Sequence, residues 1–74
     1  MTAKRMTPTE ARYYRELGDR IRAARLARGL TQRDVARMVE RRSAPAVVHW
    51  EKGHATIDPY TLRRLEKLLG TELF

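Results

Sequence analysis

The sequence predicts a small all-α domain: a compact bundle of four or five helices with an extended first helix. Apolar residues recur three and four positions apart, as on one face of a helix, and Thr or Asp precedes three of the candidate helices as an N-cap. No stretch shows the alternation of apolar and polar residues that is typical of a β-strand. Its 74 residues are enough for one domain with a modest core but not for a deep catalytic cleft. We therefore expect a flexible N-terminal arm over residues 1–6 and a single domain over residues 7–74.

The first helix is expected to begin at Pro8 and to continue to Arg28. Thr7 is placed to cap its N-terminus, Glu10 completes a capping box, and Gly29 ends the helix. An apolar stripe runs along it through Tyr14, Leu17, Ile21 and Ala24. Of the adjacent Tyr13 and Tyr14, which face different directions, we expect one to pack inward.

Two short helices follow, joined by a tight basic connector. Thr31 and Asp34 form a second capping box, which opens a helix ending near Val39. After the connector, Ser43 offers an N-cap for a helix over residues 44–51. A helix-turn-helix of this size is the unit that DNA-binding proteins place in the major groove. We therefore expect residues 7–74 to form a single helix-turn-helix domain.

The last helix has equally clear boundaries. Gly53 stops the preceding helix, and Asp58 with Pro59 begins a new one that Gly70 closes. Its apolar stripe consists of Leu62, Leu65, Leu68 and Leu69. The core predicted for the whole domain is Leu17, Ile21, Leu30, Val35, Ala36, Val39, Val47, Trp50, Ile57, Leu62, Leu65 and Leu69. Ala36 is small, which suits a position where two short helices cross closely.

The chain is strongly basic, which constrains its partners. Sixteen Lys and Arg residues against nine Asp and Glu residues give a formal net charge of +7. This charge favours an anionic partner, either duplex DNA, RNA or an anionic membrane surface. A membrane is the weakest of the three, because no apolar run approaches the length of a spanning helix. We expect a cytoplasmic protein without a membrane partner, associated with the nucleoid when it is bound to DNA.

Catalysis and metal binding have little support in the sequence. The carboxylates are scattered, without a nucleophile–base pair or a phosphate-cradling glycine loop. The absence of cysteine excludes disulfides, iron–sulfur clusters and thiolate zinc sites. His49 and His54 have no third ligand close in the sequence, whereas structural metal sites need four. The sequence predicts no enzyme activity, no metal and no cofactor.

Several features agree in order and nearly in spacing with one known family. They are Ile21, Arg25, Gly29-Leu30-Thr31-Gln32, Val35-Ala36, Ser43, Val47 and Trp50-Glu51-Lys52-Gly53. In these residues the chain resembles the helix-turn-helix domain of the Cro and phage-repressor type, the xenobiotic-response-element regulator family. The likeness covers about Leu17 to Gly70. It implies a lambda-repressor-like bundle that binds operator DNA, commonly as a dimer.

The resemblance also implies roles for particular residues. Gln32 would contact a DNA phosphate, and Arg25 would meet Glu51 in the interior; the alternative for that pair is two separate surface charges. The residues that would face base edges are Ser43, Ala44, Pro45 and His49. From their charge, we expect four further residues to neutralise phosphates: Arg33, Arg41, Arg42 and Lys52.

Two departures from the family pattern concern the connector and the third helix. Between Val39 and Ser43 the chain holds one residue more than the usual turn and lacks its glycine, which would tilt the third helix. Four residues of that helix carry no side-chain group that hydrogen-bonds a base: Ala44, Pro45, Ala46 and Val48. Apolar contact with a thymine methyl remains open to them. Ser43 and His49 are then the only polar side chains of the third helix that can contact bases, with Arg41 and Arg42 reaching from the connector.

Two functions remain open. The first is a DNA-binding transcription regulator of repressor type, which docks helix 44–51 in the major groove of double-stranded operator DNA. The alternative is a protein-interaction module, such as an antitoxin or a phage protein that binds host machinery. It is motivated by the apolar third helix and by the N-terminal extension of the first helix over residues 9–16. This extension is a dimer contact, a surface for a protein partner or simply a solvent-exposed beginning of the helix. Leu73 and Phe74 either fold back over the core or form a homodimer patch.

Overall fold

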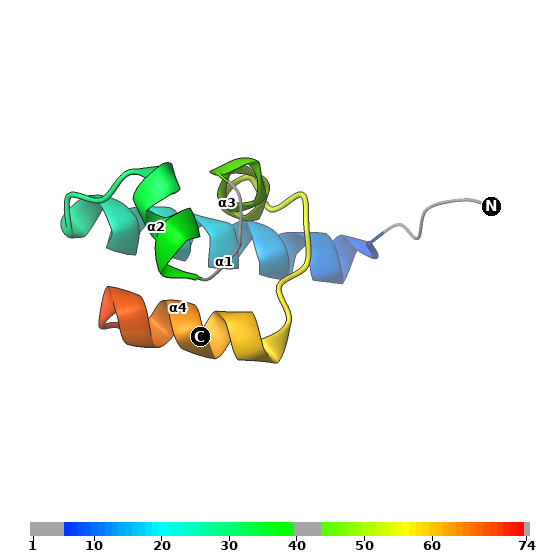
Figure 1. Cartoon of the computed structure of the whole chain (residues 1–74). Coiled ribbons are helices and arrows are strands. Elements are labelled where there is room, and N and C mark those ends of the chain that lie inside the picture. Colours follow the sequence, from blue (N-terminus) through cyan, green and yellow to red (C-terminus); the bar gives the residue numbers. More distant parts are fainter. Residues whose placement is uncertain (1–5, 40–43, 74) are drawn as a thin grey trace.

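The computed structural model describes residues 6–39 and 44–73. Over these ranges the chain forms four helices and no strand: α1 (Pro8–Ala27), α2 (Gln32–Met38), α3 (Ala44–Glu51) and α4 (Pro59–Leu69). In the view of Figure 1, α3 lies above the long α1 and α4 below it, and α2 packs against α3. The all-α class predicted from the sequence is confirmed. The arm expected over residues 1–6 lies outside the described residues except for Met6.

Local side-chain contacts set the beginnings of the first two helices. The Thr7 hydroxyl accepts a hydrogen bond from the Glu10 backbone N–H (3.1 Å), and the Glu10 carboxylate accepts one from the Thr7 N–H (2.9 Å). Thr31 and Asp34 exchange the same two bonds at 3.0 and 2.9 Å. Each box satisfies two backbone N–H groups that a helix start leaves unpaired. Both predicted capping boxes are confirmed.

Glycines close three of the four helices. Gly29, Gly53 and Gly70 all have positive φ, between 68° and 74°, a region that residues with a Cβ rarely adopt. After α3, the N–H groups of Gly53 and His54 donate back to the carbonyls of Trp50 and His49, each at 3.0 Å. This pattern pairs the last carbonyls of α3 and turns the chain toward α4.

The core agrees closely with the predicted one. Its buried apolar residues are Leu17, Ile21, Val35, Ala36, Val39, Val47, Trp50, Ile57, Leu65, Leu69 and Leu73. Leu30 and Leu62, which the sequence also placed in the core, are half-buried at its edge. Leu30 lies in the turn between α1 and α2, and Leu62 occupies the flank of α4, so each has one side toward solvent. Tyr14 packs against the core, whereas Tyr13 remains 41% exposed.

Gly18 allows α1 and the end of α3 to touch backbone to backbone. A methyl group at this buried position would clash with the Trp50 carbonyl oxygen and lie 2.8 Å from that of Glu51. On the same face of α1, a methyl on Gly53 would lie 2.7 Å from the Arg15 Cα. The end of α3 is therefore fixed directly on α1. The sequence interpretation did not identify Gly18 as a contact.

The C-terminal segment folds back onto the bundle. Leu73 is 1% exposed within the core. Its carbonyl accepts a hydrogen bond from Arg20 Nη1 (3.0 Å), and its N–H donates to Glu66 Oε2 (2.9 Å). Leu73 therefore covers the core, as in the first of the two roles considered for it; Phe74 lies outside the described residues.

Candidate nucleic-acid interface

Arg25 of α1 and Glu51 at the end of α3 form a bidentate pair in the interior. Arg25 Nε donates to Glu51 Oε2 at 2.6 Å, and Nη2 donates to Oε1 at 3.1 Å. Their side chains are only 10% and 4% exposed, so the alternative of two separate surface charges does not apply. The hydrogen bond to Glu51 raises the pKa of Arg25 above its ordinary value, against the opposite effect of burial.

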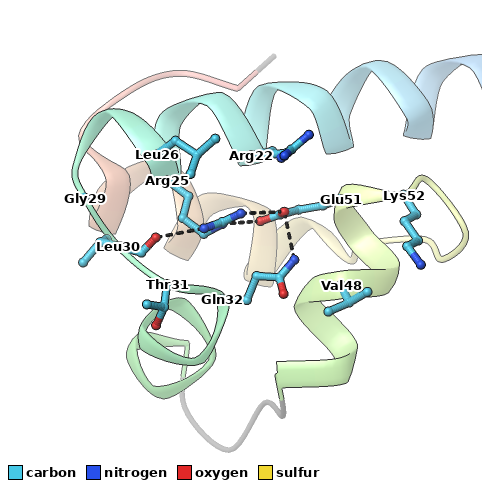
Figure 2. A pocket seen from close by; sticks show the side chains of 10 residues that line it. All are labelled: Arg22, Arg25, Leu26, Gly29, Leu30, Thr31, Gln32, Val48, Glu51 and Lys52. Carbon is cyan, nitrogen blue, oxygen red and sulfur yellow. Dashed lines mark hydrogen bonds and ion pairs between the residues drawn. The ribbon is translucent and has the colours of Figure 1, made fainter.

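This pair extends into a network that joins three helices (Figure 2). Arg25 Nη1 donates to the carbonyl of Leu30 at 2.9 Å, and Gln32 Nε2 donates to Glu51 Oε1 at 3.1 Å. The first turn of α2 is thereby tied to α1 and to the end of α3 at one point. Gln32, predicted to contact a phosphate, is half-buried. Its amide nitrogen has a second proton for another acceptor.

One face of α3 is directed outward. Val47, Trp50 and Glu51 are buried against the other helices. Pro45 and His49, four positions apart, are exposed, and so is Lys52 directly after the helix. Because residues three and four apart share a helix face, these exposed residues form one strip.

The remaining predicted contact residues lie around this strip or outside the described chain. Ala44 is half-buried in the first turn of α3, and Arg33 is exposed in the first turn of α2. The structure therefore places Gln32 and Arg33 of α2 on the element that packs against α3. Arg41, Arg42 and Ser43 lie outside the described residues.

A hollow opens between α1, the first turn of α2 and the end of α3 (Figure 2). Its charged lining residues are Arg22, Arg25, Glu51 and Lys52, beside Gln32 and Val48. Arg22 and Val48 were not among the predicted contact residues. The sequence did contain a signal for Arg22, since it precedes Arg25 by three positions and so shares its face of α1.

Two other features bear on what the domain can bind. The ring centroids of His49 and His54 are 6.4 Å apart, and no cluster of three or more metal-capable side chains occurs in the described residues. Of the described helices, none has the length and apolar character needed to cross a membrane.

Comparison with known families supports the motif that this geometry displays. The family model HTH_3, described as helix-turn-helix, matches residues 21–74. The chain belongs to the helix-turn-helix family. Within this helix-turn-helix domain, the match contains α2, α3, α4 and the end of α1 from Ile21, and it leaves residues 8–20 of α1 outside. No curated protein and no solved structure matched the chain.

Membership gives the coarse function. Helix-turn-helix domains of this family are DNA-binding modules of transcription regulators of the Cro and repressor type, so this domain is of the DNA-binding kind. The net charge of +7 suits that ligand, because duplex DNA carries one negative charge for about every 1.7 Å of its axis.

Proposed function

We propose that this domain is a repressor-type transcription regulator that inserts α3 into the major groove of operator DNA. The observation that carries the proposal is the outward strip of α3, with Pro45, His49 and Lys52 exposed while the opposite face is buried. An α-helix fits the major groove with one face toward the base edges. The first turn of α2 then lies beside the helix that would enter the groove.

In this arrangement, phosphate contacts position the protein. Arg33 in the first turn of α2 and Lys52 directly after α3 are exposed cations, and Gln32 retains a donor. Arg41 and Arg42, in the connector, are proposed to join them. Such contacts set the register on the duplex without distinguishing sequences.

Few side chains of this domain are placed to contact base edges. His49 is exposed and can donate or accept hydrogen bonds at a base edge. Ser43 is proposed as the second polar contact, while Pro45 and Ala44 can contact a thymine methyl only through apolar surface. We therefore expect a short recognition motif with preference for A·T pairs beneath Pro45.

The buried network has a specific part in this function. Glu51 accepts hydrogen bonds from Arg25 of α1 and from Gln32 of α2 while it belongs to α3. The first turn of α2 is thereby held to the end of α3 before DNA arrives, and contacts made by a pre-positioned surface cost less ordering entropy.

A protein-interaction role is the second candidate. It is favoured by the apolar character of α3, where Pro45 is exposed and Ala44, Ala46 and Val48 are half-buried. An antitoxin or a phage protein that binds host machinery could use this face to hold a partner helix.

Selection of bound sequences from a random duplex pool distinguishes the two functions. A DNA-reading domain should enrich a motif, and two-fold symmetry in that motif would show binding as a homodimer. A folded, cooperatively melting protein that enriches no sequence over the input pool would contradict the regulator and favour the protein-interaction role.

A further inference from the structure

We propose that the hollow between α1, the first turn of α2 and the end of α3 is a seat for one DNA backbone phosphate, held by Arg22 and Lys52. This inference rests on the proposed DNA-binding function and adds α1 to the elements that touch the duplex. Neither the resemblance nor the outward strip of α3 assigns a ligand contact to Arg22.

The hollow carries an excess of positive charge. Its lining contains three cations, Arg22, Arg25 and Lys52, and a single carboxylate, Glu51. Both oxygens of Glu51 already accept hydrogen bonds, one from Arg25 Nε and the other from Arg25 Nη2 and Gln32. The lining therefore has excess positive charge, and its only anion is already hydrogen-bonded by Arg25 and Gln32.

The two outer cations of the hollow, Arg22 and Lys52, remain available to a ligand. Arg25 is held by Glu51 and by the Leu30 carbonyl at the bottom of the hollow. Arg22 and Lys52, in contrast, are exposed, and neither makes a side-chain hydrogen bond or ion pair with another residue of the described chain. A guanidinium presents a planar pair of donors that matches two oxygens of a phosphate, and an ammonium adds a third donor.

Arg22 and Lys52 also lie where a bound duplex would pass. Arg22 lies on α1 and Lys52 directly after α3, and both border the hollow beside the Arg25–Glu51 pair (Figure 2). Lys52 also ends the outward strip that includes Pro45 and His49. A duplex whose groove receives that strip would bring one backbone past Lys52, and Arg22 lines the same hollow. The buried pair beneath them keeps α1 and the end of α3 at a fixed separation.

Salt titration of DNA affinity tests the seat. The affinities of wild type, Arg22→Ala, Lys52→Ala and the double variant for one mixed-sequence duplex would be measured over a series of salt concentrations. Because one phosphate contact contributes a slope of about −0.9 in log affinity against log salt, the double variant should flatten the slope by about 0.9. Two separate phosphates would instead flatten it by about 1.8, which overturns the shared seat.

Two control variants isolate the local effect from the loss of net charge. Arg63→Ala removes an exposed arginine on α4, the helix that Figure 1 shows on the other side of α1 from α3. It should leave the slope at the wild-type value, and Arg22→Lys, which keeps the charge, should do the same. Both arginines are exposed, so the fold should persist in each variant, and circular dichroism checks this.

The outcomes separate this inference from the function on which it rests. If wild type binds DNA and Arg22→Ala matches Arg63→Ala in affinity and slope, the seat is wrong and DNA binding stands. If wild type binds no duplex at any salt concentration, both proposals fall.

Discussion

Gly18 on α1 lies so close to Trp50 at the end of α3 that it has no room for a side chain. A methyl group there would clash with the Trp50 carbonyl oxygen, which is backbone and cannot rotate away. This contact sets the distance between the longest helix and the helix proposed to enter the groove. The geometry of the proposed interface therefore depends on a residue that touches no DNA.

We expect Gly18→Ala to destabilise the domain although alanine favours helices. Helix propensity alone would add roughly 0.5–1 kcal/mol of stability, but overpacking against backbone costs roughly 1–3 kcal/mol. The cost of the clash should exceed the gain in helix propensity, and thermal or urea unfolding measures the resulting change in the free energy of unfolding. Ala23→Gly, at an exposed position of the same helix, calibrates propensity without a clash. A Gly18→Ala protein more stable than wild type would contradict the close approach.

A second prediction concerns the buried pair. Glu51→Ala leaves the Arg25 guanidinium buried without its carboxylate, and should lower the free energy of unfolding by about 3–5 kcal/mol. Replacing both residues by apolar side chains of similar volume should recover much of the loss. Chemical denaturation of the two single variants and the double variant completes the cycle. Single variants that unfold like wild type would show that the pair contributes nothing to stability.

The third prediction uses pH. Hydrogen bonds from the backbone and hydroxyl of Thr31 lower the pKa of Asp34 below its ordinary 3.8. Since the folded-state pKa is the lower one, the cap stabilises the domain fully above the unfolded pKa, and this stabilisation is lost as pH falls through the folded pKa. Melting temperatures from about pH 6 to about pH 2 should therefore fall less steeply in Asp34→Asn than in wild type.

Asp19→Asn is the matched control for the pH experiment. Asp19 is an exposed carboxylate within α1, away from any helix start. The control should show the same acid-induced fall in melting temperature as wild type. Identical curves for Asp34→Asn and wild type would mean that the charge of the Asp34 carboxylate does not contribute to stability.

The fourth prediction concerns the connector. If Arg41 and Arg42 neutralise phosphates, replacing both with alanine should flatten the salt dependence of DNA affinity by roughly one to two units of slope. Arg63→Ala again corrects for lost net charge. An unchanged slope in the double variant would place the connector away from the duplex.

Helix boundaries could be predicted from this sequence because their causes are local. Thr7 with Glu10 and Thr31 with Asp34 lie three positions apart, so the pattern is complete in the sequence itself. The core followed from apolar spacing for the same reason. The edge positions Leu30 and Leu62 differed, since periodicity does not show where a bundle ends, and the predicted core did not include Leu73.

The features that could not be predicted from the sequence are contacts between helices that pack against one another. A glycine within a helix does not reveal that another backbone touches it, so Gly18 could not be recognised before α3 was placed. The sequence left two roles for Leu73, covering the core or forming a homodimer patch. Its backbone is held by hydrogen bonds with Arg20 and Glu66, and Arg20 is distant in sequence. Likewise, the Gln32–Glu51 bond joins residues 19 positions apart, and family likeness had given Gln32 only a role toward DNA.

The central claim is that α3 enters the groove, and the most direct test is a single affinity panel. Wild type, Gln32→Ala, His49→Ala and Ala44→Arg would be titrated against the selected duplex and its single-base variants. Gln32→Ala should weaken binding to every duplex alike, because phosphate contacts carry no sequence information. Ala44→Arg should strengthen binding to all duplexes by adding a charge at the groove.

Within that panel, His49→Ala tests whether α3 contacts base edges. The account predicts a change confined to particular base positions, by about 1–3 kcal/mol if His49 makes a good base contact. If the Gln32, His49 and Ala44 variants all bind every duplex with wild-type affinity, α3 does not enter the groove, and the helix-turn-helix serves instead as a surface for a protein partner.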